Sequence, residues 1–288
     1  MVSVYKGKKI NEGITGSWHG VEPRTVRFSQ IIINFISRNL QNMGFFFHVG
    51  KYFELMLKVF TKPEKGIMYY RQTVREIEAL GLNSVGIVFI ISVFMGAVIT
   101  LQTAYNTENP FLPSYLIGLG CRDSMILEFS STMVALILAG KVGSNIASEL
   151  GTMRVTEQID ALEIMGVNSA SYLILPKIIA CILIFPLLTL FSMIVGVAGG
   201  WLAVLFTHVI TPTDFVYGIQ YAFIPFYITY SVIKMVVFAF LITSISSYHG
   251  YYSYGGALEV GISSTRAVVH SSVFILLFNV ILTQLILS

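Results

Sequence analysis

The chain has 288 residues, of which 55% are hydrophobic and only 11% charged, and its formal net charge is +3. Soluble domains carry about 25% charged residues. This composition and the mean hydropathy of +0.76 therefore exclude an ordinary soluble domain, and we expect no nucleic-acid partner. Cys121 and Cys181 lie in apolar runs. We interpret them as small buried hydrophobes, not as a disulfide or metal ligands.

The first 83 residues are the most polar part of the chain. Residues 1–42 read as a polar and basic extension that is partly disordered, and residues 43–83 as interfacial and cytoplasmic helices. Apolar side chains recur there at helical spacing, namely Phe45, Val49, Tyr52, Phe53, Met56, Val59 and Phe60. The pattern favours an amphipathic helix in the membrane interface, although a core helix on the bundle has the same pattern. A second helix is expected from Pro63 to Gly81.

Residues 84–288 contain the apolar stretches long enough to cross a membrane. A bilayer core of about 30 Å needs about 20 apolar residues per helix. Five stretches satisfy this length, at about Ser84–Thr103, Tyr115–Gly140, Ser171–Phe206, Ile224–Tyr248 and Ala267–Leu287. The predicted fold is therefore an all-α membrane protein of about five transmembrane helices, preceded by the interfacial helix.

Basic residues set the expected orientation. Residues 1–83 hold 12 of the 18 Lys and Arg, and the connection between the second and third spans adds Lys141, Arg154 and Lys177. The connections at about 104–114 and 207–223 hold none. The positive-inside rule places the basic segments in the cytoplasm. We therefore predict a cytoplasmic N-terminus and, with five spans, an external C-terminus.

The connection between the second and third spans has a helical pattern of its own, over about residues 149–165. Ile159, Leu162 and Met165 can form an apolar stripe. The polar positions are Glu149, Arg154, Glu157, Gln158, Asp160 and Glu163. Such a helix can rest on the membrane and present charges to a partner, but an ordinary solvated helix has the same pattern.

This segment also carries a recognisable sequence. The run AGKVGSNIASELGTMRVTEQ, residues 139–158, closely resembles the signature of MlaE/YrbE-type permeases. Three further segments resemble that family, namely Lys62-Pro63-Glu64, the run from Ile233 to Ala239, and the loop from Gly255 to Val269. The resemblance covers about residues 45–288. Two positions depart from the family pattern, because Leu127 stands where the family has Arg and Ser131 where it has Pro.

The resemblance implies a function and partners. Proteins of this family are permease subunits of ABC-type phospholipid transporters, and they form homodimers in the bacterial inner membrane. A separate P-loop ATPase binds on the cytoplasmic side and an MCE-domain protein on the periplasmic side. By that resemblance, residues 84–288 form the permease domain, and helix 149–165 with its six polar residues couples it to the ATPase.

The sequence contains no Walker A motif, so we expect the energy for transport to come from a partner. A Walker A motif needs G-x-x-x-x-G-K-[ST], but Gly140-Lys141 is followed by Val142, and position 135 is Ala. We therefore expect no catalytic residues and no cofactor in this chain, with ATP and Mg on the partner. His208, His249 and His270 show no ligand spacing, which argues against a metal site.

Two charges fall inside the predicted spans. Glu128 and Lys234 lie near mid-span, where isolated charges are costly and often functional. They could pair with each other, bind a lipid phosphate or, for Lys234, reach an interface. Gly196 and Gly200 have the G-x-x-x-G spacing of close helix packing, either within one subunit or at a dimer seam.

Two other function classes remain open at this stage. One is an ion-coupled secondary transporter that uses Glu128 and Lys234, and the other is a membrane scaffold without transport. Secondary transporters often contain internal repeats, and none is visible in this sequence.

Overall fold

The computed structural model describes residues 47–61, 66–107 and 112–287. The chain divides into two units, Met1–Phe53 and Glu54–Ser288. In the first unit only residues 47–53 are described, and they are helical. The predicted extension over residues 1–42 lies outside the described residues. The second unit holds all the long helices.

Every described element of regular secondary structure is helical. Five helices are long and apolar enough to cross a membrane, so the predicted all-α fold with about five spans is confirmed. The spans are Tyr69–Asn106, Leu116–Val155, Ser169–Thr207, Phe226–Tyr251 and Ala257–Leu287. The first is built from α2 (Gly66–Glu76), η1 (Ile77–Gly81), η2 (Leu82–Ser84) and α3 (Val85–Asn106). The second comprises α4 (Leu116–Ser124), η3 (Met125–Met133), α5 (Val134–Leu138), η4 (Ala139–Gly143) and α6 (Ser144–Val155).

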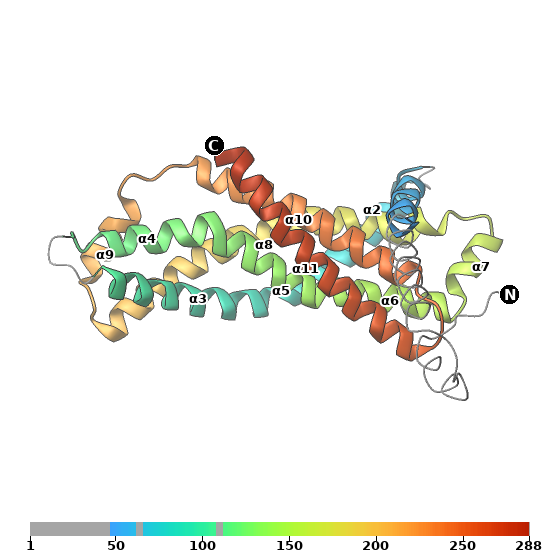
Figure 1. Ribbon diagram of the computed structural model, residues 1–288, viewed down its shortest axis with the longest axis horizontal. Coiled ribbons are helices and arrows are strands. Elements are labelled where there is room, and N and C mark those ends of the chain that lie inside the picture. The colour runs from blue at the N-terminus through green and yellow to red at the C-terminus, as the bar shows by residue number, and fades with distance from the viewer. Residues whose placement is uncertain (1–46, 62–65, 108–111, 288) are drawn as a thin grey trace, which may run out of the picture. The chain divides into compact units, whose positions relative to one another are not determined.

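The other three spans are single helices, α8 (Ser169–Thr207), α10 (Phe226–Tyr251) and α11 (Ala257–Leu287). Two short helices complete the unit, α7 (Gln158–Ile164) and α9 (Pro212–Gln220). Helix α8 packs against both α3 and α10, and α10 packs against α11. Figure 1 shows α7 and α9 at opposite ends of these helices. The unit therefore presents a different short helix at each end.

Gly81 does not end a helix, contrary to the prediction. The chain stays helical from Gly66 through η1 and η2 into α3, so the first span begins before residue 84. The reason is packing. A Cβ atom on Gly81 would lie 2.3 Å from Cγ1 of Ile184 on α8. The missing side chain lets the two helices approach closely, and it is not a helix stop.

The glycines of α8 have the same use. A Cβ atom on Gly199 would lie 2.3 Å from the carbonyl oxygen of Val93, and one on Gly96 would lie 1.7 Å from that of Gly196. A Cβ atom on Gly200 would lie 2.5 Å from Oγ1 of Thr100. Gly196 and Gly200 thus lie in the packing between α3 and α8 of one subunit.

Substituting Gly199 by Val should disrupt this packing. The new side chain meets backbone, which cannot rotate away, so we expect a loss of at least about 1–3 kcal/mol in the free energy of unfolding. Thermal unfolding of the purified chain measures the loss. Gly86→Val is the matched control on α3, because nothing lies within 4 Å of its Cβ position. Equal unfolding temperatures for the two variants would contradict the packing described here.

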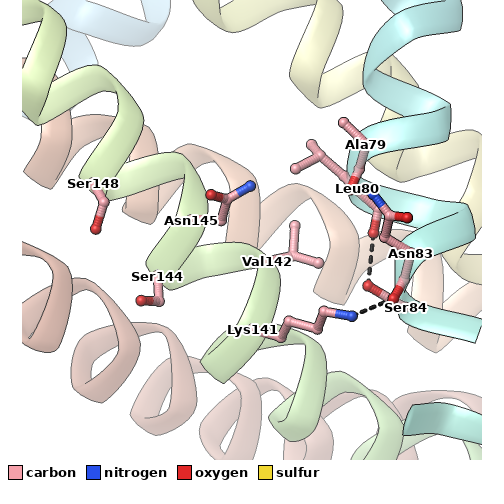
Figure 2. Close-up of a pocket in the computed structure, with 9 residues that line it drawn as sticks. All are labelled: Ala79, Leu80, Asn83, Ser84, Lys141, Val142, Ser144, Asn145 and Ser148. Atoms are coloured by element: carbon pink, nitrogen blue, oxygen red, sulfur yellow. Dashed lines mark hydrogen bonds between the residues drawn. The ribbon is translucent and has the colours of Figure 1, made fainter. Parts of the chain in front are cut away.

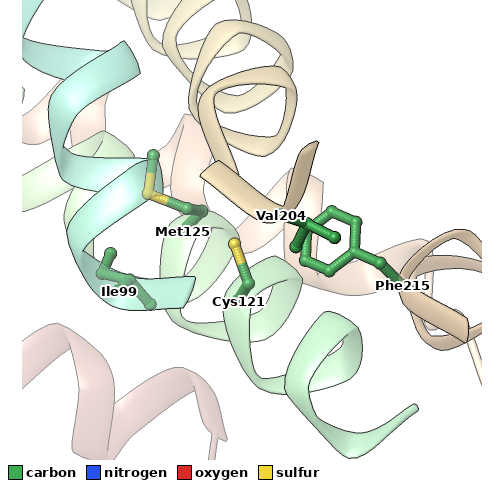
Figure 3. Packing of buried hydrophobic residues seen from close by; sticks show 5 residues of the cluster. All are labelled: Ile99, Cys121, Met125, Val204 and Phe215. Carbon is green, nitrogen blue, oxygen red and sulfur yellow. The ribbon is translucent and has the colours of Figure 1, made fainter. Parts of the chain in front are cut away.

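The end of the bundle that carries α9 has its own apolar core. Figure 3 shows Ile99 of α3, Cys121 of α4, Met125 of η3, Val204 of α8 and Phe215 of α9 packed together. Both Cys121 and Cys181 are free thiols and buried, as predicted. This cluster fixes α9 to three spans.

The helix before the first span exposes apolar side chains. Leu55 and Val59 are fully buried, whereas Leu57 and Phe60 are more than half exposed. The Asn168 amide donates to the carbonyl oxygens of Lys58 and Thr61, both at 2.9 Å, and so satisfies the end of this helix. An exposed apolar face suits a membrane interface, and the interfacial placement stays a prediction.

Candidate functional site

Glu128 and Lys234 meet inside the bundle. Nζ of Lys234 donates to Oε2 of Glu128 at 2.8 Å and to the Tyr230 hydroxyl at 3.1 Å. The Lys234 side chain is fully buried, while that of Glu128 is 43% exposed. The two intramembrane charges therefore form one ion pair, in which the lysine is enclosed and the carboxylate is partly exposed.

Helix α11 completes the network around this pair. The Asn279 amide donates to Oε1 of Glu128, and the Thr132 hydroxyl donates to Oδ1 of Asn279 at 3.0 Å. The Tyr230 and Thr283 hydroxyls share a hydrogen bond of 2.7 Å. Polar groups from η3, α10 and α11 are thus linked in mid-span. Sequence reasoning missed Asn279 and Thr283, because an uncharged polar residue in an apolar run gives a weak signal.

The wide turns of η3 help to build this network. In a π-helix each backbone hydrogen bond joins residues five positions apart, one more than in an α-helix. The carbonyl oxygens of Ile126 and Leu127 accept from Ser231 and Lys234 of α10. The backbone of the second span therefore takes part in holding Lys234. π-helical turns are frequent at functional sites.

The predicted coupling helix 149–165 is two helices. Helix α6 ends at Val155 and α7 begins at Gln158, and Glu157 between them has a left-handed φ of 60°. An ion pair joins the two sides of the break. Arg154 of α6 binds Asp160 of α7 at 2.6 Å, and Ile159 is fully buried. The segment is thus a bent element fixed to the bundle, not one straight helix.

Most of its predicted coupling charges bind within the chain. Lys177 of α8, only 2% exposed, contacts Glu149 at 2.8 Å and Glu76 of α2 at 2.7 Å. Glu163 accepts hydrogen bonds from Ser169 at 3.0 Å and Tyr251 at 2.9 Å. Glu149 and Glu163, like Arg154 and Asp160, therefore have partners before any other subunit binds.

Two of the six predicted coupling residues lie on the exposed surface of this segment, beside two apolar residues that were not among the six. The side chains of Glu157 and Gln158 are exposed and have no partner among the described residues. Ile164 is 87% exposed and Met165 is 68% exposed. We name these four residues the α7 tip. The sequence pattern placed Met165 in one stripe with Ile159, but in the structure Ile159 is buried and Met165 is exposed.

Arg122 lies away from the Glu128 pair. It binds Asp123 at 2.8 Å and donates to the carbonyl oxygens of Ile219 and Tyr221, at 2.8 and 2.7 Å. It therefore caps the end of α9, and no hydrogen bond links it to Glu128. The two departures from the family pattern at Leu127 and Ser131 lie on either side of Glu128 in η3.

Two of the three histidines near span ends come together. Nε2 of His249 on α10 lies 2.7 Å from Nδ1 of His270 on α11. Within the described part of the chain, no group of three or more His, Cys, Asp or Glu side chains could hold a metal ion. The pair therefore joins α10 to α11.

Comparison with known proteins decides the family. The pattern of the family described as Permease MlaE matches residues 73–285, which include the Glu128 pair and the α7 tip. The chain belongs to the MlaE permease family. This permease is 35% identical over 237 residues to a probable ABC transporter permease protein of Rickettsia bellii, which covers 82% of this chain and 91% of that protein.

Two other organisms also hold similar proteins. A probable ABC transporter permease protein of Synechocystis is 35% identical over 233 residues, covering 81% of this permease and 88% of that protein. The chloroplastic protein TRIGALACTOSYLDIACYLGLYCEROL 1 of Arabidopsis thaliana is 34% identical over 229 residues, covering 76% of this permease and 63% of that protein.

These similarities confirm the family predicted from residues 139–158. The chain is a multi-pass membrane permease subunit of the ABC transporter type, a class that works with a partner ATPase. In this permease the signature runs from η4 through α6 to the start of α7. It therefore includes Glu149, which binds Lys177, and Glu157 at the helix break.

Proposed function

We propose that this permease provides the membrane pathway for phospholipid in an ABC-type transporter of the bacterial inner membrane. The observation that carries the proposal is the family match over residues 73–285. The plant relative, whose name is that of a glycerolipid, supports a lipid substrate. The spans hold few charges, and those at mid-span are paired, which suits an apolar cargo.

The proposed assembly has three further parts. A P-loop ATPase binds at the α7 end, an MCE-domain protein binds at the α9 end in the periplasm, and two copies of the permease form a homodimer. The basic residues support a cytoplasmic α7 end, since Lys141, Arg154 and Lys177 lie there and the connections at the other end have no Lys or Arg. The N-terminus is then cytoplasmic and the C-terminus external.

The energy source separates this function from its alternatives. We reconstitute the permease in vesicles with a labelled phospholipid, either alone under an imposed ion gradient or with its ATPase and ATP. Lipid should move only with the ATPase and ATP. Movement by the permease alone under the gradient would identify an ion-coupled transporter using Glu128 and Lys234. If the assembled complex moved no lipid with ATP, the result would favour a membrane scaffold without transport.

The α7 tip predicts where the ATPase binds. Replacing Ile164 and Met165 by Ala should remove most of the exposed apolar surface of the tip, and buried apolar anchors dominate binding energy. We expect at least a tenfold weaker association with the ATPase, roughly 1.4 kcal/mol, measured by co-purification at graded ATPase concentrations.

Phe206→Ala is the matched control for this prediction. Phe206 is 83% exposed, but it lies at the end of α8 near α9. Its loss should leave ATPase binding unchanged. If the Phe206 variant lost the ATPase and the tip variant kept it, the proposed docking surface would be at the wrong end.

A further inference from the structure

A polar pocket lies between the start of the first apolar run and the α6 end of the second span. Its volume is about 460 Å³, within the range of small-molecule sites. Ala79, Leu80, Asn83 and Ser84 form one wall; Lys141, Val142, Ser144, Asn145 and Ser148 form the other. Figure 2 shows the two walls facing each other across the pocket, with the Lys141 side chain extending toward Asn83.

The pocket lies where both spans leave their apolar runs. Asn83 and Ser84 come directly before the apolar stretch of α3, and Lys141 comes three residues after α5 ends. Polar groups at such positions are at the level of the lipid headgroups. The floor is apolar, because Leu80 and Val142 are both 2% exposed.

Three donors line one wall with helical spacing. Lys141, Asn145 and Ser148 are four and three residues apart, which places them on one face of the helix that runs from η4 into α6. The side chains of Asn145 and Ser148 have no hydrogen bond to another described residue, whereas the Ser144 hydroxyl is bonded to Ser264. The wall therefore offers an amide and a hydroxyl that are free to bind a ligand.

Lys141 differs from the buried lysines of the spans. Lys177 and Lys234 each contact carboxylates, but Lys141 has no carboxylate within ion-pair distance in the described part of the chain. Its Nζ donates to the backbone carbonyl of Asn83, which leaves two N–H groups and the full positive charge. No acidic residue lines the pocket. A cation, an amide and a hydroxyl without a carboxylate match a phosphate group.

We propose that this pocket binds the phosphate group of a membrane phospholipid, with Lys141 supplying the charge and Asn145 and Ser148 the hydrogen bonds. The choice of a lipid as the source of that phosphate rests on the proposed permease function. The pocket then receives the headgroup at the membrane boundary, apart from the mid-span Glu128 pair, and the acyl chains stay in the bilayer.

Native mass spectrometry of the purified full chain tests this proposal. The probes are phosphatidylglycerol and a diacylglycerol with the same acyl chains but no phosphate. The wild-type chain should retain phosphatidylglycerol and not diacylglycerol. Lys141→Gln should lower retained phosphatidylglycerol about tenfold, since it removes one charge-assisted contact, whereas Lys141→Arg should retain it. Without added lipid, the unfolding temperature of both variants should equal that of the wild type.

Two further variants separate the pocket from general surface charge. Arg266→Gln removes an exposed basic residue outside the pocket and should leave retention unchanged. Asn145→Leu keeps Lys141 but removes the amide and should lower retention. Equal retention by the wild type and Lys141→Gln, or an equal loss in Arg266→Gln, overturns the proposal.

Excess inorganic phosphate tests whether the pocket recognises a free phosphate or only the phosphate of a lipid headgroup. Displacement of the lipid by inorganic phosphate shows that the pocket recognises the phosphate alone, and no displacement shows that it needs the whole lipid; either result supports a phosphate site. ATP-dependent lipid movement by the wild-type complex is measured separately. Failure of that movement contradicts the permease function, while the binding results above decide the pocket.

Discussion

Replacing Lys234 by Met should destabilise the folded chain by about 3–5 kcal/mol, the usual cost of removing one partner of a buried ion pair. Lys234 is fully buried and its Nζ lies 2.8 Å from Glu128. Without the ammonium group, Glu128 must take up a proton or remain charged in mid-span. The bond from the Asn279 amide then holds only one side of the carboxyl group. Thermal unfolding in detergent measures the loss.

Two variants control this result. Lys141→Met removes a lysine that has no carboxylate partner among the described residues, and its unfolding free energy should change by no more than about 0.5 kcal/mol. The double variant Lys234→Met, Glu128→Gln removes both charges and should recover most of the lost stability. If the double variant were less stable than Lys234→Met alone, the two residues would not act as a pair.

Replacing Lys177 by Met should have an effect of similar size, about 3–5 kcal/mol, at the α7 end. Lys177 holds two carboxylates, Glu76 of α2 and Glu149 of α6. Removal of the lysine leaves the two carboxylates close together without a cation between them. Their repulsion should move α6 away from α2. Because α6 leads to the α7 tip, we also expect weaker ATPase binding.

The stability lost on removing each carboxylate should depend on how deeply that carboxylate is buried. The Glu76 side chain is 18% exposed and that of Glu149 is 44% exposed, and solvent weakens the more exposed pair. Glu76→Gln should therefore cost more stability than Glu149→Gln, and both should cost less than Lys177→Met. A Glu149→Gln variant as unstable as Lys177→Met would contradict this ranking.

The five spans could be predicted because length and hydropathy are local properties of the sequence. The pairing of Glu128 with Lys234 could not, since the residues are 106 positions apart and their contact depends on how η3 meets α10. Asn279 and Thr283 complete the network, and each contributes one uncharged polar group to a largely apolar run.

Two local predictions failed for physical reasons that lie in the tertiary structure. Gly81 was interpreted as a helix stop, but Ile184 of α8 occupies the space beside it. The apolar stripe of Ile159, Leu162 and Met165 predicts one helix over residues 149–165, whereas the structure bends at Glu157. A left-handed glutamate is uncommon, and the Arg154–Asp160 contact and the buried Ile159 hold the bend.

The movement of phospholipid itself tests the proposed function most directly. Vesicles that contain the permease, its ATPase and its MCE-domain partner are given ATP together with a labelled phospholipid and labelled glycerol phosphate, which shares the headgroup chemistry but has no acyl chains. A lipid permease predicts ATP-dependent movement of the phospholipid and none of the glycerol phosphate. ATP-dependent movement of glycerol phosphate without the phospholipid, or equal phospholipid rates with and without ATP, would contradict it.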